Sequence, residues 1–246
     1  MATYPARAAN LKVTLDLITP QLDRLFLCLN EYDTVPDFLS EYDNVEAYLP
    51  EADLKDTGKF VFKPAPEDEV FLLDDDLRYA SNYVEHMRAI LPGAIDQNAV
   101  LGVYGLIMKE KFHRRGFKRH YYKMRKPLPE SIFVDYVGTG TLYARGCNLP
   151  PFDVMHDSKR FTDIRYARWC HENGISHICV ARKYGLIKPQ ETDESIYADF
   201  TRELPATVFD EVKAFGRQNP HLGHPVESIL TLPGQPLDSV GERKGH

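Results

Sequence analysis

The apolar residues of this chain come in short, nearly continuous runs that end abruptly at polar side chains. Residues 24–29 form one such run and are followed by Asn30, and residues 70–73 form another and are followed by Asp74 to Asp76. Short unbroken apolar runs are typical of strands that are covered on both faces of a sheet. We therefore expect two buried strands whose carboxyl ends carry polar groups.

Helical patterns alternate with these runs. Residues 7–18 carry apolar side chains on one face before Pro20, and residues 79–91 do so before Pro92. Because strands and helices alternate, we expect an α/β fold with a mainly parallel sheet and flanking helices. Further strands are predicted at residues 99–108, 132–134, 141–143 and 177–180, further helices at 161–170 and 206–215, and irregular structure at 31–58, 109–130 and from 218 onward.

Length and composition limit the class of protein. The chain has 246 residues, of which 43% are hydrophobic, and this suits a single domain with a buried core. No apolar run approaches the roughly 20 residues that span a bilayer, and the first residues lack a signal-peptide pattern, so we expect a cytoplasmic protein. The four cysteines have no C-x-x-C spacing, which predicts free thiols and no zinc site.

The charge is unevenly distributed along the chain. The formal net charge is −6, which argues against general nucleic-acid binding. Residues 109–126 nevertheless contain nine Lys or Arg residues and a single acid, Glu110. A basic island on an acidic chain predicts a local anionic partner. On charge alone, a solvated loop explains the segment equally well.

The three consecutive aspartates are the strongest chemical signal. Like charges at this spacing repel one another unless a cation lies among them, and hard divalent cations such as Mg²⁺ or Mn²⁺ prefer oxygen ligands. A divalent cation held there could bridge to a diphosphate and neutralise charge on a leaving nucleoside diphosphate. The alternative is that Asp75 or Asp76 caps the helix that follows.

Seven segments in chain order make the sequence recognisable. They are Tyr4-Pro5-x-Arg7; Cys28-Leu29-Asn30-Glu31 with Val35-Pro36; Asp56-x-Gly58-Lys59-Phe60; Asp74-Asp75-Asp76 with Tyr83-Val84-Glu85; Gly102-Val103-x-Gly105; Gly138-Thr139-Gly140-Thr141; and Arg160-Phe161-x-Asp163 with Ile178-Cys179-Val180. With them the chain resembles GT-A-type glycosyltransferases, and most closely the small bacterial α-N-acetylglucosaminyltransferases that build heparosan capsule polysaccharide. The resemblance covers about residues 1–185.

The resemblance implies a GT-A-like, Rossmann-like domain over residues 1–246, with a nucleotide-sugar half at about 1–108 and an acceptor half at about 109–246. Asp76, with Asp74, would hold Mn²⁺ or Mg²⁺. Asp163 would be the carboxylate near the reacting sugars. The nucleotide-sugar pocket would be lined by Tyr4, Arg7, Asn30, Asp56, Lys59, Asp74, Asp75 and the turn Gly138-Thr139-Gly140-Thr141. Asp56 would help to hold the base or would orient Lys59.

Each residue type has a physical reason to serve in these roles. Arginine and lysine suit phosphates, and an asparagine suits a base edge. The glycines of the turn allow close backbone approach, and its hydroxyls can bond sugar oxygens. Without the resemblance, Lys59 would be read as a solvated lysine, the turn as a plain hairpin, and Asp163 as an acid in the first turn of a helix.

The implied reaction transfers N-acetylglucosamine from UDP-N-acetylglucosamine to a saccharide in polysaccharide synthesis, with retention of configuration. An inverting transferase with another nucleotide sugar shares the fold and much of the motif set. Asp163 would be the general base in an inverting enzyme and would stabilise the oxocarbenium-like centre in a retaining one. A non-enzymatic alternative is a module that binds an anionic polymer through the basic segment.

The basic segment has its own expected role. We expect a mobile lid that orders over the active site and holds an acidic acceptor, either a uronic-acid-containing saccharide or a lipid-linked one. We also expect a peripheral location at the inner membrane and an association with a membrane-bound polysaccharide synthesis complex. The acceptor-binding residues would be Arg114, Arg115, Lys118 and Arg119.

Overall fold

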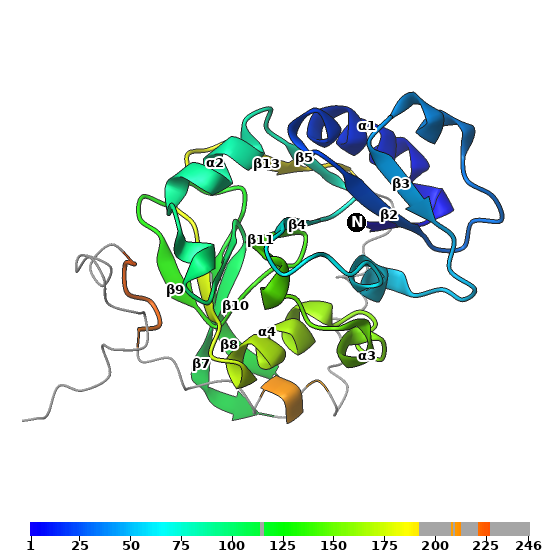
Figure 1. Ribbon diagram of the computed structural model, residues 1–246. Helices are drawn as coiled ribbons and strands as arrows, with labels where there is room; N and C mark the ends of the chain where they lie inside the picture. The colour runs from blue at the N-terminus through cyan, green and yellow to red at the C-terminus, as the bar shows by residue number, and fades with distance from the viewer. Residues whose placement is uncertain (114–115, 192–207, 209, 213–220, 227–246) are drawn as a thin grey trace, which may run out of the picture.

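The computed structural model describes residues 1–113, 116–191, 208, 210–212 and 221–226, with backbone alone for residues 109–113 and 116–118 (Figure 1). The N-terminal sheet is parallel throughout, with the strand order β1 (Ala2–Thr3), β2 (Leu25–Leu29), β3 (Val45–Tyr48). The helix α1 (Ala8–Ile18) connects β1 to β2 and follows the 3₁₀ turn η1 (Pro5–Arg7). The predicted helix at residues 7–18 is therefore confirmed, as is the buried strand that ends at Asn30.

A five-stranded sheet forms the centre of the molecule. Its order is β4 (Glu69–Leu73), β11 (Thr141–Arg145), β6 (Ala99–Gly102), β12 (Ser176–Cys179), β9 (Ile132–Val134). Only β12 and β6 are parallel neighbours. The α/β class is thus confirmed, but the expectation of a mainly parallel sheet holds only for the N-terminal sheet. A strand covered on both faces gives the same apolar run whichever way it points.

Helices cover the central sheet on both faces. Figure 1 shows α1 and α2 (Tyr83–Ile90) on one side of the strands, and α3 (Phe152–Met155) and α4 (Thr162–Glu172) on the other. Successive residues of a strand point to opposite faces. Leu101 of β6 accordingly packs in the core with α1 and α2, and Val100 packs in the core with α3 and α4.

The predicted helix at residues 79–91 begins later than expected. Residues 77–79 instead form the short strand β5 (Leu77–Tyr79), which pairs antiparallel with β13 (Ile187–Pro189). The predicted helix at 161–170 and strand at 177–180 match α4 and β12 within two residues. The predicted helix at 206–215 lies largely outside the described residues, of which 208 and 210–212 are helical, and so does most of the tail from 218.

The basic segment is not the long loop that its charge suggested. Apart from residues 114 and 115, which lie outside the described residues, the segment 105–122 forms a hairpin of β7 (Gly105–His113) and β8 (Gly116–Tyr122), and β7 also pairs with β10 (Tyr136–Val137). The predicted strand at 99–108 is correspondingly two strands, β6 and β7. The aromatic residues among the cations favour strand structure, and the high charge obscured that preference.

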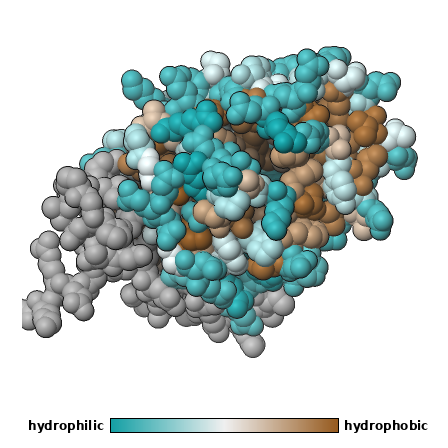
Figure 2. Space-filling view, viewed as in Figure 1, coloured by the Kyte–Doolittle hydropathy of each residue, from teal (hydrophilic) through white to brown (hydrophobic). Residues whose placement is uncertain are grey.

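The region at 31–58 is also more ordered than predicted. It contains β3 and the 3₁₀ turns η3 (Asp37–Glu41) and η4 (Lys55–Phe60), of which η4 is buried over its last four residues. Other 3₁₀ turns are η2 (Thr19–Gln21), η5 (Ala94–Asp96) and η6 (Gly146–Asn148). Exposed apolar residues occur near β3, and Figure 2 shows apolar surface gathered on the side of the molecule where Figure 1 places β2 and β3.

Two glycines border β11. A Cβ added to Gly140 would lie 1.8 Å from Asp74 Oδ2, and one added to Gly146 would lie 1.9 Å from the carbonyl oxygen of Ala65. Both positions therefore need glycine because neighbouring groups approach the backbone directly. Within the part of the chain that the structure describes, no helix is long and apolar enough to cross a membrane.

Candidate functional site

The three aspartates form a turn between β4 and β5, and their carboxylates point to different surroundings. Asp75 is buried, with 3% of its side chain exposed, whereas 38% of Asp74 and 25% of Asp76 are exposed. We call residues 74–76 the acidic turn. It lies at the carboxyl end of β4, where ligands of α/β sheets commonly bind. Neither Asp75 nor Asp76 caps α2, because β5 separates the turn from that helix.

Arg7 holds two of the three carboxylates. One of its terminal nitrogens donates to Asp75 Oδ1 at 2.7 Å and lies 3.1 Å from Asp76 Oδ2. Its guanidinium also lies over the ring of Tyr4, 5.3 Å from the centroid. Burial alone would lower the pKa of Arg7, but the two aspartates outweigh it and raise that pKa. The N-terminal motif Tyr4-Pro5-x-Arg7 and the acidic turn are therefore one structural unit.

Asp76 is electrostatically strained. Its pKa is raised to about 6, mainly by burial. The neighbouring charge of Asp74 also raises this pKa, and that increase is larger than the decrease caused by Arg7. Burial also raises the pKa of Asp75 despite its contact with Arg7. A cation placed between Asp74 and Asp76 would relieve the repulsion that raises the pKa of Asp76.

The carboxylates of the acidic turn suit a metal ion whose remaining ligands come from a substrate. Among the described residues, no group of three or more His, Cys, Asp or Glu side chains is arranged to hold a metal ion by itself. Mg²⁺ in phosphate-transfer sites is commonly held by one or two carboxylates together with substrate phosphates. Asp74 and Asp76 supply such a pair, so these residues fit Mg²⁺ or Mn²⁺ in company with a diphosphate.

Lys59 is a buried cation at the centre of the site. It belongs to η4 and pairs with Asp74 Oδ1. Burial lowers its pKa, but Asp74 first, and then Asp163 and Asp56, raise it above its ordinary value. Lys59 is therefore charged and lies among three carboxylates. The interpretation of Lys59 as a solvated lysine is wrong, since only 6% of its side chain is exposed.

The glycine-threonine turn, residues 138–141, lies directly beside the acidic turn. Gly140 faces the carboxylate of Asp74, and Asp163 Oδ1 accepts hydrogen bonds from the backbone N–H of Thr139 at 2.8 Å and from its hydroxyl at 2.7 Å. Burial raises the pKa of Asp163, and the bonds from Thr139 act in the opposite direction. The turn thus joins the acidic turn to the first turn of α4.

The threonine hydroxyls of this turn are engaged within the protein. Thr139 donates to Asp163, and the Thr141 hydroxyl oxygen accepts from the backbone N–H groups of Val103 and Tyr104, each at 3.2 Å. Both threonines are buried. A turn at residues 138–141 is therefore present as predicted, and its threonine hydroxyls serve internal contacts.

Asn30 and Asp56 also turn inward. The Asn30 side chain donates to the carbonyl of Lys55 and accepts from the N–H of Leu54, each at 2.9 Å, which fixes the start of η4. Asp56 accepts from the backbone N–H of Arg160 at 2.7 Å and from the Thr162 hydroxyl at 2.8 Å, which fixes the start of α4. These two residues position Lys59 and Asp163 respectively, because η4 and α4 carry those side chains.

The predicted acceptor-binding residues are only partly described. Arg114 and Arg115 lie outside the described residues, as does the side chain of Lys118, while Arg119 is half-buried on β8. The hairpin does reach the site through aromatic contacts. The ring of Tyr121 on β8 lies 6.3 Å from that of Tyr104, and Tyr104 in turn lies beside Gly138.

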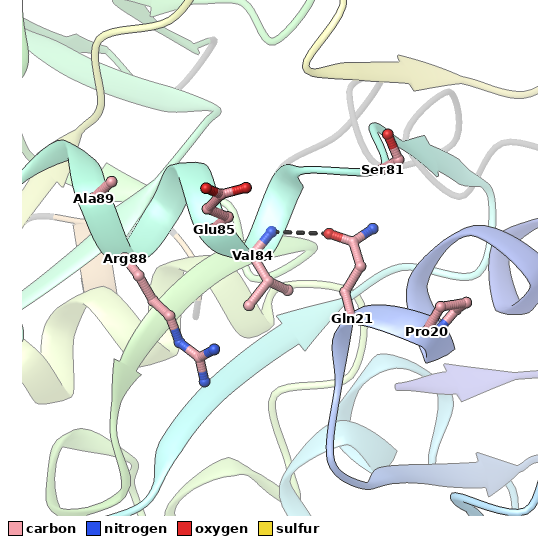
Figure 3. A pocket seen from close by; sticks show the side chains of 7 residues that line it. All are labelled: Pro20, Gln21, Ser81, Val84, Glu85, Arg88 and Ala89. Atoms are coloured by element: carbon pink, nitrogen blue, oxygen red, sulfur yellow. Dashed lines mark hydrogen bonds between the residues drawn. The ribbon is translucent and has the colours of Figure 1, made fainter.

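A separate cavity of about 510 Å³ lies between η2 and α2 (Figure 3). The amide of Gln21 is fully used there, since it accepts from the N–H of Val84 at 3.1 Å and donates to the carbonyls of Leu17 and Ala80. Arg88 pairs with Glu69. The main polar groups of this cavity thus serve the fold, and we place the functional site at the acidic turn.

Sequence reasoning missed Tyr79, whose hydroxyl accepts from the backbone N–H of Asp74 at 2.9 Å and donates to the carbonyl of Gly140 at 2.7 Å. An aromatic residue close after an acidic triplet carries no distinctive pattern, so no sequence signal identified it. Comparison of the chain with models of protein families finds no match, and comparison with curated proteins finds none either.

Proposed function

We propose that this protein is a metal-dependent glycosyltransferase that takes a sugar from a nucleoside diphosphate sugar and transfers it to a saccharide hydroxyl. The donor that the sequence segments favour is UDP-N-acetylglucosamine, with capsule-type polysaccharide as the product. The proposal rests on the site at the acidic turn and on the ordered segments that form it.

One observation carries the proposal: among the side chains that the structure describes, carboxylates outnumber cations at the site. Two cations, Arg7 and Lys59, lie among five carboxylates, namely those of Asp56, Asp74, Asp75, Asp76 and Asp163. An anionic diphosphate would be repelled from such a site. A divalent cation held by Asp74 and Asp76 reverses the local sign of charge, so nucleotide binding should depend on the metal.

The chain's own residues have separable tasks in this reaction. Asp74 and Asp76 would hold the metal, which supplies Lewis-acid neutralisation of the charge that develops on the leaving diphosphate. Arg7 fixes the orientation of Asp76 through its shared contact with Asp75. Lys59 pairs with Asp74 and holds the orientation of its carboxylate. Asp163, which Thr139 holds in place, would be the carboxylate near the donor sugar.

The experiment that tests the proposal is calorimetric titration of UDP in the presence of Mn²⁺, of Mg²⁺ and of EDTA. We expect binding with either metal and at least tenfold weaker binding in EDTA, because the uncompensated carboxylates repel the diphosphate. Asp76→Asn should lose the metal-dependent part of the affinity. GDP and CDP serve as competitor nucleotides.

A matched control is Asp96→Asn. Asp96 is exposed and pairs with Arg145. It lies in η5, which precedes the N-terminal end of β6. This variant should bind UDP as the wild type does. Equal UDP affinity with Mn²⁺ and with EDTA in the wild-type protein would contradict metal-dependent nucleotide binding and, with it, the proposed function.

A further inference from the structure

The hydroxyl of Tyr79 occupies the junction between the two turns that make up the site. It accepts from the backbone N–H of Asp74 at 2.9 Å and donates to the backbone carbonyl of Gly140 at 2.7 Å. The contacts lie on the main chain of both turns, so they constrain backbone position rather than a side-chain rotamer. One oxygen atom thereby connects the acidic turn to the glycine-threonine turn.

We propose that Tyr79 is a positioning residue whose hydroxyl holds the proposed metal-binding carboxylates of the acidic turn in fixed register with the glycine-threonine turn. The inference deepens the proposed function and rests on it for its consequence in catalysis. The linkage itself is a property of the folded chain and can be tested without any ligand.

The surroundings of Tyr79 leave the hydroxyl little freedom. The side chain is 1% exposed, and β5, which it ends, is paired with β13 through Ile187 opposite Tyr79. The ring packs against that of Tyr83, with centroids 4.9 Å apart. Burial raises the pKa of Tyr79 far above its ordinary value, so the hydroxyl keeps the proton that it donates to Gly140.

The linkage extends to the predicted catalytic carboxylate. Gly140 is next to Thr139, and Thr139 binds Asp163 through both its N–H and its hydroxyl. On the other side, Asp74 carries the contact with Lys59. Direct contacts therefore run from Lys59 and Asp74 through Tyr79 to Gly140, Thr139 and Asp163. Loss of the hydroxyl would leave the Asp74 N–H and the Gly140 carbonyl without this partner.

The chain supplies a matched control next to Tyr79. Tyr83 is equally buried and packs against Tyr79, but its hydroxyl has no hydrogen-bond partner among the residues that the structure describes. Tyr79→Phe and Tyr83→Phe remove the same atom from neighbouring buried rings. Only the first variant removes a contact between the two turns.

Amide hydrogen exchange tests the linkage in the ligand-free protein. In Tyr79→Phe, the amide of Asp74 should exchange at least tenfold faster than in the wild type, because its acceptor is gone, while the amides of α2 keep their rates. In Tyr83→Phe, the Asp74 amide should exchange at the wild-type rate. An unchanged Asp74 rate in Tyr79→Phe would overturn the proposal.

Titration of Mn²⁺-UDP and donor kinetics test the consequence for function. We expect Tyr79→Phe to weaken Mn²⁺-UDP binding about tenfold and to raise the donor KM, with the acceptor KM unchanged, and we expect Tyr83→Phe to match the wild type. Binding and KM values within twofold of the wild type in Tyr79→Phe would overturn the positioning role. A wild-type protein that binds no UDP would instead overturn the proposed function, and the exchange rates would still decide whether the linkage exists.

Discussion

At the scale of single residues, the site combines the partly exposed carboxylates of Asp74 and Asp76 with buried side chains that hold backbone segments in place. Sequence reasoning found the polar residues, assigned Asn30 to the nucleotide, and assigned Asp56 either to the base or to the orientation of Lys59. Their partners lie 25 residues away for Asn30 and 104 residues away for Asp56, in segments whose proximity exists only in the folded chain. The residue types predicted a cluster of polar side chains in this region. Tertiary contacts determine which of these side chains remain available for binding a ligand.

Asp163 is the residue whose loss should affect chemistry most. In Asp163→Asn, the remaining oxygen can still accept from Thr139, so the fold and donor affinity should be retained. The negative charge is lost, and turnover should fall by about a hundredfold, the effect of removing a group that acts in the transition state. Steady-state kinetics with donor and acceptor varied separately would measure this.

The control for that variant is Glu172→Gln on the same helix, which removes an exposed pair with Arg168 far along α4. Its turnover should equal that of the wild type. Near-normal turnover in Asp163→Asn would mean that the carboxylate serves only to hold Thr139.

At the scale of elements, apolar runs and amphipathic patterns predicted where most strands and helices lie, and missed how the strands pair. The run at residues 70–73 became β4 as expected, yet β11, its neighbour, runs antiparallel to it. The direction of a strand relative to its neighbour depends on contacts between segments far apart in sequence, and a local sequence pattern does not contain this information. The basic hairpin was missed for a different reason: charge was taken as evidence for a loop.

Asp135, which lies between β9 and β10, makes the stability of the sheet β10-β7-β8 depend on pH. Its carboxylate accepts from the N–H of Met108 on β7 at 2.6 Å, and burial raises its pKa to about 6. An unfolded aspartate has a pKa near 3.9, so folding takes up a proton between these values and stability falls as the pH rises through about 6.

Asp135→Asn should therefore raise the free energy of unfolding at pH 8 by about 1–3 kcal/mol and change it little at pH 4. Urea denaturation at the two pH values would measure the difference. Asp153→Asn, an exposed acid on α3, should change stability by less than about 0.5 kcal/mol at both. An equal effect of Asp135→Asn at pH 4 and pH 8 would contradict the role of its charge.

At the scale of the whole molecule, charge is segregated rather than mixed. The chain has a net charge of −6, although residues 109–126 are strongly basic, and the structure places that segment on a hairpin that contacts the site through Tyr121 and Tyr104. A basic segment on an otherwise acidic protein can orient an elongated anionic substrate. The role of the basic segment in acceptor binding stays a prediction.

Simultaneous replacement of Arg114, Arg115, Lys118 and Arg119 by glutamine tests that prediction. The acceptor KM for an acidic saccharide should rise several-fold at low salt, and the difference from the wild type should shrink at high salt, where surface charges are screened. Donor KM should change less. Replacing the cations that follow the hairpin, Lys123, Arg125 and Lys126, is the matched comparison, with a smaller effect expected. Unchanged acceptor kinetics at low salt would leave the hairpin without this role.

The two glycines that border β11 also determine how reliably the central sheet can assemble. A strand that slips by two residues keeps its inward and outward faces, so the alternation of side chains does not by itself forbid such an error. For β11 the slip would carry a side chain into the space beside Asp74 or beside the Ala65 carbonyl, where no Cβ fits. The two glycines at the ends of β11 therefore select the correct register, because a slip by two residues in either direction would place a side chain where only hydrogen fits.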